Sequence, residues 1–128
     1  MTFVLDASAL VKLFAEQEGS QAFRDWYVQN ASQAKLGPHL LWCEVGRVLQ
    51  KVDRGSSAAA LAEMHRRVMA GIDLRPVAEA LAWKHAASST FYDAQYVALA
   101  DGEGATLVTC DRRMEKAGKD AGVPVVLL

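Results

Sequence analysis

The sequence predicts an α/β domain with a mainly parallel sheet that is covered by helices on both faces. Two observations predict this fold class. Short apolar runs, typical of strands buried on both faces, alternate with longer segments in which apolar residues recur at helical spacing. This alternation is the pattern of a parallel sheet whose strands are connected through helices. The sequence also contains no internal repeat and no long linker, so residues 1–128 are expected to form one domain.

Each expected element rests on a local pattern. Strands are expected where apolar residues run together, at 3–5, 72–74, 105–109 and 123–128. Helices are expected where apolar residues recur every three or four positions, at about 9–14, 21–29, 38–55, 57–68, 77–87, 91–101 and 112–119. Gly37 and Pro38 are interpreted as a chain break, because Pro38 suits the first turn of the third helix. Pro124 predicts an edge position for the last strand, because proline has no N–H group to donate.

Composition and charge exclude several classes of protein. Hydrophobic residues make up 52% of the chain and charged residues 23%, as in a globular protein, and this apolar share indicates a partner surface. The net charge of −1 gives no general support for nucleic-acid binding. The two cysteines follow no metal or redox spacing, which suits a reducing cytosol. Neither a signal peptide nor a membrane-spanning stretch is recognised, so we expect a cytoplasmic protein with no membrane partner.

Two carboxylates lie at the ends of predicted core strands. Asp6 follows the strand at 3–5, and Asp111 follows the strand at 105–109 after one further residue. In an open α/β sheet, the carboxyl ends of the strands border the crevice in which ligands bind. The alternative is that each aspartate only caps the helix that follows it, since Asp is among the preferred N-cap residues.

Two further acids lie on or beside the inward faces of predicted helices. A projection at about 100° per residue places Asp93 on the apolar face of its helix, beside Tyr96. Thr90 and Asp93 also fit the form of a capping box, which explains an acid in the first turn but not an acid turned towards the core. Glu44 lies at the border of an apolar stripe, where an ordinary ion pair with Arg47 is the alternative.

Taken together, these acids indicate a metal site. A buried carboxylate is costly unless it is paired or bound to a metal, and the sequence offers no obvious buried cation for each one. If the acids converge, their mutual repulsion favours binding of divalent cations, and all-oxygen ligands suit Mg²⁺ or Mn²⁺. One or two such ions are what metal-assisted hydrolysis of a phosphodiester requires. The candidate ligands and catalytic residues are Asp6, Glu44, Asp93 and Asp111.

The motifs around these acids resemble the PIN domain and, within it, the VapC ribonuclease toxins of bacterial toxin–antitoxin pairs. The resemblance covers nearly the whole chain and is carried by Val4–Leu10, Glu44, Tyr92–Ala94 and Thr109–Arg113. It implies a three-layer α/β/α sandwich and metal-dependent endonucleolytic cleavage of RNA. It also implies a homodimer and a small antitoxin that blocks the active site.

The resemblance also assigns roles to single residues. The four acidic positions of the family fall on the four acids named above, and its small polar helper positions fall on Ser8 and Thr109. Such hydroxyls orient an acid or a water molecule in a metal site. Trp42 and Cys43 depart from the family pattern, in which smaller or aliphatic residues are usual, and this departure concerns local packing.

Other residues receive more ordinary interpretations. Basic residues beside the acids are candidate contacts to RNA phosphates, with a solvated helix face as the alternative: Arg47, Lys51, Arg112 and Arg113. The three histidines match no metal-ligand spacing and are interpreted as structural. The stripe formed by Phe23, Trp26 and Tyr27 is expected to pack in the core or at a dimer contact.

The sequence therefore predicts a Mg²⁺- or Mn²⁺-dependent endoribonuclease. The alternative is a non-catalytic binding module of the same fold, in which the acids only cap helices. A phosphotransfer or phosphatase domain is a further alternative. It would need either a second aspartate two residues after Asp6 or an aspartate that ends a middle strand together with a late lysine, and Ser8 occupies the first of these positions.

Overall fold

The computed structural model describes residues 1–128 as a five-stranded sheet with helices packed around it. The strands are β1 (Thr2–Leu5), β2 (Ala34–Pro38), β3 (Asp73–Arg75), β4 (Thr106–Thr109) and β5 (Val125–Leu127). The helices are α1 (Ala7–Leu10), α2 (Ser20–Gln29), α3 (His39–Val52), α4 (Ala58–Met69), α5 (Glu79–Ala86), α6 (Phe91–Glu103) and α7 (Arg112–Asp120), and the 3-10 helix η1 (Val11–Leu13) follows α1. None of these helices has the length and apolar character needed to cross a membrane.

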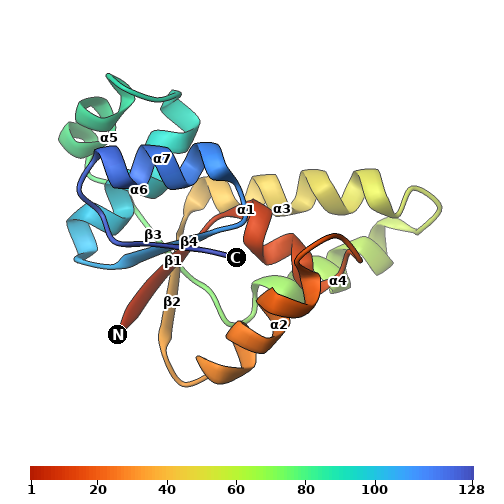
Figure 1. Ribbon diagram of the computed structural model, residues 1–128. Helices are drawn as coiled ribbons and strands as arrows, with labels where there is room; N and C mark the ends of the chain where they lie inside the picture. The colour runs from red at the N-terminus through yellow and green to blue at the C-terminus, as the bar shows by residue number, and fades with distance from the viewer.

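The sheet is entirely parallel, with the strand order β3-β2-β1-β4-β5. From β1 the chain moves outward to β2 and β3, and it then crosses to β4 and β5 on the other side of β1. Because such connections are right-handed, α1 to α4 cover one face and α5 to α7 the other, a division that can be followed in Figure 1. The expected α/β/α arrangement is therefore confirmed, and β5 lies at an edge as Pro124 predicts.

This strand order fixes where a ligand site is expected. The direction in which the chain winds reverses between β1 and β4, which pair through Val4 and Leu107. Ligand crevices in open α/β sheets lie beyond the carboxyl ends of the strands at such a reversal. The residues that follow Leu5 and Thr109 therefore occupy the position where a site is expected.

The strand β2 corrects the sequence analysis. Gly37 and Pro38 were expected to form a chain break and no strand was expected at 34–38, and that expectation is wrong. The segment has only one bulky apolar residue, Leu36, and it ends in Gly37 and Pro38, which are unusual in an interior strand. Lys35 is buried, but its Nζ donates to the carbonyl oxygens of Asn30 and Gln33 beyond the end of α2, at 2.6 and 3.0 Å. Pairing with β1 and β3 on both sides, not local preference, makes this segment a strand.

Helix α6 packs across the central strands of the sheet. Val4 and Leu5 of β1 and Leu107 and Val108 of β4 are fully buried. Most residues of α6 from Asp93 onwards are buried as well, so this helix is covered on nearly all sides. The buried part of α6 begins at Asp93, in its first turn.

Aromatic and histidine side chains pack as the sequence analysis expects. Phe23 is fully buried, and its ring stacks on that of Trp26 at 5.9 Å between centroids. His85 is buried between α5 and α6, with Nε2 at 2.8 Å from Oδ2 of Asp101. The ring of His65 packs against Trp42, which joins α4 to α3. These two helices project together to one side of the sheet (Figure 1).

Candidate active site

Asp6 leaves the carboxyl end of β1 with only 3% of its surface exposed. It caps α1, because its Oδ1 accepts a hydrogen bond from the N–H of Ala9 at 3.0 Å. The Ser8 hydroxyl donates to the same oxygen at 2.7 Å, and the Thr109 hydroxyl donates to Oδ2. The helix-cap interpretation of Asp6 is therefore correct but incomplete, since two further hydroxyls hold the carboxylate in place.

Burial also changes the acidity of Asp6. Its pKa is raised to about 6, chiefly because burial disfavours the charged form. The negative charge of Asp111 acts in the same direction, whereas the hydrogen bonds from Thr109 and Ser8 oppose it. A carboxylate that is this difficult to ionise is stabilised by any cation placed beside it.

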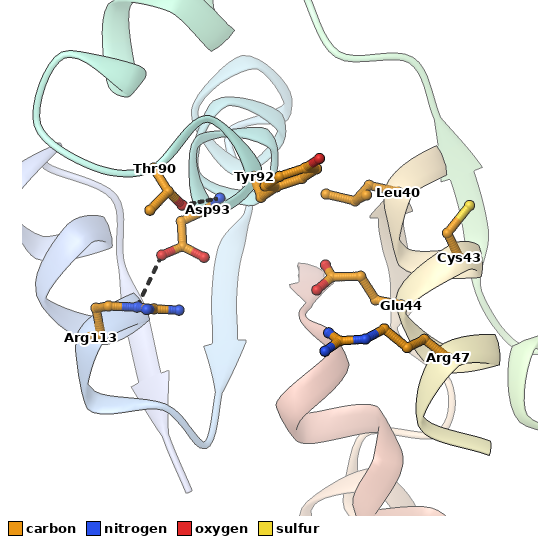
Figure 2. Close-up of a pocket in the computed structure, with 8 residues that line it drawn as sticks. All are labelled: Leu40, Cys43, Glu44, Arg47, Thr90, Tyr92, Asp93 and Arg113. Carbon is orange, nitrogen blue, oxygen red and sulfur yellow. Dashed lines mark hydrogen bonds and ion pairs between the residues drawn. The ribbon is translucent and has the colours of Figure 1, made fainter. Parts of the chain in front are cut away.

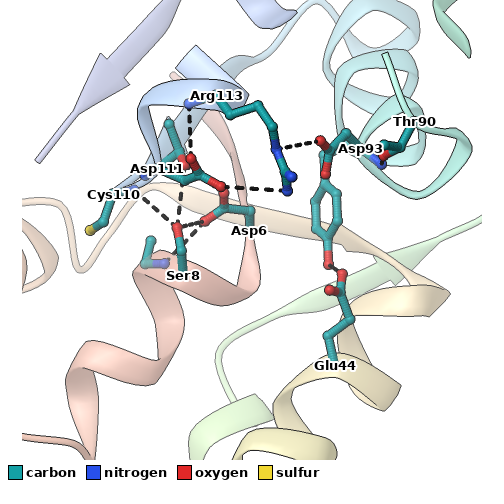
Figure 3. Close-up of polar contacts among 11 residues, drawn as sticks. Asp6, Ser8, Glu44, Thr90, Asp93, Cys110, Asp111 and Arg113 are labelled. Atoms are coloured by element: carbon teal, nitrogen blue, oxygen red, sulfur yellow. Dashed lines mark hydrogen bonds and ion pairs between the residues drawn. The ribbon is translucent and has the colours of Figure 1, made fainter. Parts of the chain in front are cut away.

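Asp111 is joined to Asp6 through the Thr109 hydroxyl, and the Ser8 hydroxyl links Asp6 to the neighbouring Cys110. Thr109 Oγ1 accepts a hydrogen bond from the Asp111 N–H at 3.0 Å, and Ser8 Oγ accepts one from the Cys110 N–H at 3.1 Å. Asp111 also caps α7, because its Oδ1 accepts from the N–H of Arg113 at 2.8 Å. Figure 3 shows this network, which ties the end of β4 to the end of β1.

Asp93 lies in the first turn of α6, with 8% of its surface exposed. Thr90 caps the helix by accepting a hydrogen bond from the Asp93 N–H at 3.0 Å. The reciprocal half of a capping box does not form, because the Asp93 carboxylate turns to Arg113, whose Nε lies 3.2 Å from Oδ2. The Nη2 of Arg113 lies 3.8 Å from Oδ2 of Asp111. One guanidinium group therefore lies between two of the candidate metal ligands (Figure 3).

Glu44 approaches the same region from α3. It forms no ion pair with Arg47, and its Oε1 instead accepts a hydrogen bond from the hydroxyl of Tyr96 in α6. Burial raises the pKa of Tyr96 far above its usual range, and the hydrogen bond to Glu44 and the charges of Glu44, Asp6 and Asp93 raise it further. The Tyr96 phenol therefore lies within electrostatic range of three acids.

This role of Tyr96 was not predicted from the sequence, in which Tyr96 is only an apolar neighbour of Asp93. The sequence feature that could have indicated this role is the position of Tyr96 three residues after Asp93, which puts both side chains on one face of α6.

A pocket opens between α3 and the start of α6. Its walls are Leu40, Cys43, Glu44, Arg47, Thr90, Tyr92, Asp93 and Arg113. In Figure 2, Glu44 and Arg47 lie on one side of the opening, and Asp93 and Arg113 lie on the other. Asp6 and Asp111 do not line this pocket. Of the four basic candidates, Arg47 and Arg113 line it, whereas Lys51 and Arg112 are exposed elsewhere.

The donor chemistry of this edge fits a divalent cation. No three acidic, histidine or cysteine side chains converge closely enough to hold an ion in the present arrangement. The carboxylates of the four candidate acids and the hydroxyls of Ser8 and Thr109 are all oxygen donors, which is the type of ligand that Mg²⁺ and Mn²⁺ prefer. Asp6 is nearly buried, and no cationic side chain forms an ion pair with it.

The fold and this site define an α/β/α domain with an acidic centre at the reversal point of a parallel sheet. The family model of the PIN domain matches residues 3–120, and the chain belongs to the PIN domain family. PIN domains are generally nucleases that use divalent metal ions. No curated protein matches the chain.

Solved structures share the fold over nearly the whole chain. PAE2754 from Pyrobaculum aerophilum is 27% identical, with a TM-score of 0.72 over 98% of this chain and 90% of its own. VapC20 of Mycobacterium tuberculosis, a sarcin-ricin loop cleaving toxin, is 19% identical, with a TM-score of 0.65 over 91% of this chain and 95% of its own. FitAcB from Neisseria gonorrhoeae is 16% identical, with a TM-score of 0.65 over 96% of this chain and 95% of its own.

Proposed function

We propose that this PIN domain is a Mg²⁺- or Mn²⁺-dependent endoribonuclease and the toxin of a toxin–antitoxin pair. One observation carries the proposal: Asp6, Glu44, Asp93 and Asp111 come from four separate elements to the carboxyl edge of β1 and β4. Helix capping accounts for part of the role of Asp6 and Asp111. It does not account for the carboxylates of Asp93 and Glu44, neither of which caps a helix.

The proposed roles follow from these contacts. The four acids would hold one or two ions, and a bound divalent cation would supply Lewis acidity to polarise the phosphodiester. Ser8 and Thr109 hold the Asp6 carboxylate in a fixed orientation through their hydroxyls. Fixed ligands of this kind lower the cost of assembling a metal site.

Basic side chains around the pocket supply contacts to the substrate backbone. Arg47 and Arg113 line the pocket that contains Glu44 and Asp93, where they can meet RNA phosphates. Lys51 and Arg112 extend the basic surface beyond it. RNA is favoured as the substrate because VapC20, which has the same fold, is a sarcin-ricin loop cleaving toxin.

Partners are proposed as well. Trp83 and Phe91 expose large apolar surfaces at the corner of α5 and α6, with ring centroids 4.7 Å apart, and this patch supports a homodimer. A small antitoxin that blocks the pocket is proposed from the resemblance to VapC toxins. We place the protein in the cytoplasm, where its two free cysteines, Cys43 and Cys110, stay reduced.

The proposal is tested by incubating the purified protein with total RNA in Mn²⁺ or in chelator. Cleavage is expected in Mn²⁺ only, and Asp6→Asn and Asp93→Asn are each expected to abolish it while leaving the circular dichroism spectrum unchanged. Asp25→Asn, on the exposed surface of α2, is the matched control and is expected to cut normally. Full cleavage by either active-site variant would refute the proposal.

A further inference from the structure

Arg113 is the only cationic group that reaches the candidate metal ligands. Its Nε lies 3.2 Å from Asp93 Oδ2, and its Nη2 lies 3.8 Å from Asp111 Oδ2. The two carboxylates come from different elements, Asp93 from α6 and Asp111 from the end of β4. The guanidinium therefore joins two parts of the site. No other ion pair in the protein involves Asp6, Glu44, Asp93 or Asp111.

The two partners of this contact differ in burial. The Asp93 side chain is only 12% exposed, whereas that of Arg113 is 71% exposed. A carboxylate as buried as Asp93 needs a compensating cation. Arg113 provides that cation from the second residue of α7, at the end of a long side chain that can move into solvent without disturbing the core.

A divalent ion bound between Asp93 and Asp111 would lie among the carboxylate oxygens that now face the Arg113 guanidinium. Two cations cannot both occupy the short space between these carboxylates, because each needs direct contact with oxygen lone pairs and the cations repel one another. Metal binding and the Arg113 contacts are therefore alternatives.

We propose that Arg113 is a built-in counter-ion that competes with the divalent cation for Asp93 and Asp111. In the metal-free protein it neutralises these acids, and on metal binding its guanidinium leaves them and turns towards solvent. The measured affinity for metal is then lower than the intrinsic affinity of the carboxylates. Only the fraction of molecules in which Arg113 has left the acids can bind the ion. This inference rests on the proposed function, in which these acids hold the ion.

The test compares Mn²⁺ affinity, measured by electron paramagnetic resonance, in the wild type, Arg113→Gln and Arg112→Gln. Arg112 is the adjacent residue of α7, is exposed and forms no ion pair, so its replacement removes the same charge without the contacts. Arg113→Gln is expected to bind Mn²⁺ about two- to fivefold more tightly than the wild type, which is the upper part of the range that exposed ion pairs justify. Arg112→Gln is expected to change the affinity less than twofold.

A second readout follows the movement itself without any cleavage assay. In the wild type, the Nε–H of Arg113 is expected to shift and exchange faster as Mg²⁺ is added, in nuclear magnetic resonance spectra that resolve arginine side chains. Arg113→Lys retains the positive charge but replaces the planar guanidinium by a single ammonium nitrogen. Its Mn²⁺ affinity is expected to lie between those of the wild type and Arg113→Gln.

The outcomes separate this inference from the proposed function. Equal or weaker Mn²⁺ binding by Arg113→Gln, in a protein whose binding is lost in Asp6→Asn, would overturn the role of Arg113 and leave the metal site standing. An Arg113 signal that does not respond to Mg²⁺ would also overturn it. If neither the wild type nor Arg113→Gln binds Mn²⁺, both the inference and the proposed function fail.

Discussion

The hydroxyl of Tyr96 donates a hydrogen bond to the Glu44 carboxylate across a separation of 52 residues in sequence. It joins α6 to α3, two helices that cover opposite faces of the sheet and meet beyond its carboxyl edge. Because Tyr96 is buried and three residues after Asp93, this one contact fixes the distance between two of the four acids.

Replacement of Tyr96 by phenylalanine therefore tests how far metal binding by Glu44 depends on the hydrogen bond from the Tyr96 hydroxyl. The ring remains in the core, but Glu44 loses a donor worth about 1.5–3 kcal/mol to a charged acceptor. We expect Mn²⁺ affinity and RNA cleavage to fall by about tenfold or more, with the fold retained. Isothermal titration calorimetry and a cleavage assay measure the two effects. Tyr27→Phe, at a half-buried tyrosine with no hydrogen-bonded hydroxyl, is the control, and equal affinities in all three proteins would contradict the expectation.

The raised pKa of Asp6 predicts how stability depends on pH in the metal-free protein. The folded-state pKa is about 6, above the value of 3.8 for the free side chain. The folded protein therefore holds this proton more tightly than the unfolded chain, so the contribution of Asp6 to stability is greatest below pH 3.8. That contribution is lost as the pH rises from 3.8 to 6, at a cost on the order of 3 kcal/mol.

Asp6→Asn removes this cost, because an amide does not ionise. In chelator at pH 7.5 we expect the variant to unfold at a higher urea concentration than the wild type, and at pH 4 we expect the difference largely to disappear. An active-site residue that reduces stability in this way is a common trade-off with function. A constant difference between the two proteins at both pH values would show that ionisation of Asp6 is not the cause.

Thr109 and Ser8 are expected to affect Asp6 unequally. Both hydroxyls donate to its carboxylate and lower its pKa, and the Thr109 bond has the larger effect. Thr109→Val should therefore raise the pKa of Asp6 more than Ser8→Ala does. Carboxyl ¹³C chemical shifts followed over a pH titration measure both values. A larger shift in Ser8→Ala would contradict the order of the two contacts.

The close packing of α7 on the sheet makes a separate prediction about stability. A Cβ atom at Gly118 would lie 2.6 Å from Cγ2 of Val125 and 3.1 Å from Cδ2 of Leu107. Gly118→Ala is expected to destabilise the protein by about 1–3 kcal/mol, because the branched Val125 in β5 has little freedom to move away. At Gly55 an added Cβ meets nothing within 4 Å, so Gly55→Ala is the control and should be nearly neutral in urea denaturation. Equal stabilities of the two variants would contradict the expectation.

Local patterns in the sequence were enough to predict most of this fold. Apolar runs marked β1, β3, β4 and β5, and helical spacing marked the seven helices to within a few residues. The same reasoning selected the acids, because a carboxylate that directly follows a buried strand, or lies on the inward face of a helix, conflicts with its surroundings. The mismatch between a carboxylate and the apolar residues beside it can be recognised from residues that are neighbours along the chain.

The contacts between segments that are distant in sequence were decided only by the tertiary structure. The strand β2 has a sequence typical of a break and becomes a strand because β1 and β3 supply partners on both sides. The hydrogen bond from Thr109 to Asp6 spans 103 residues, and Arg113 reaches Asp93 from another helix. The sequence by itself determined four of the five strands, the helices and the choice of the four candidate acids, because the spacing of apolar and charged residues is a local property. The long-range partners of these acids were decided by how the strands pair and the helices pack, which no local pattern records.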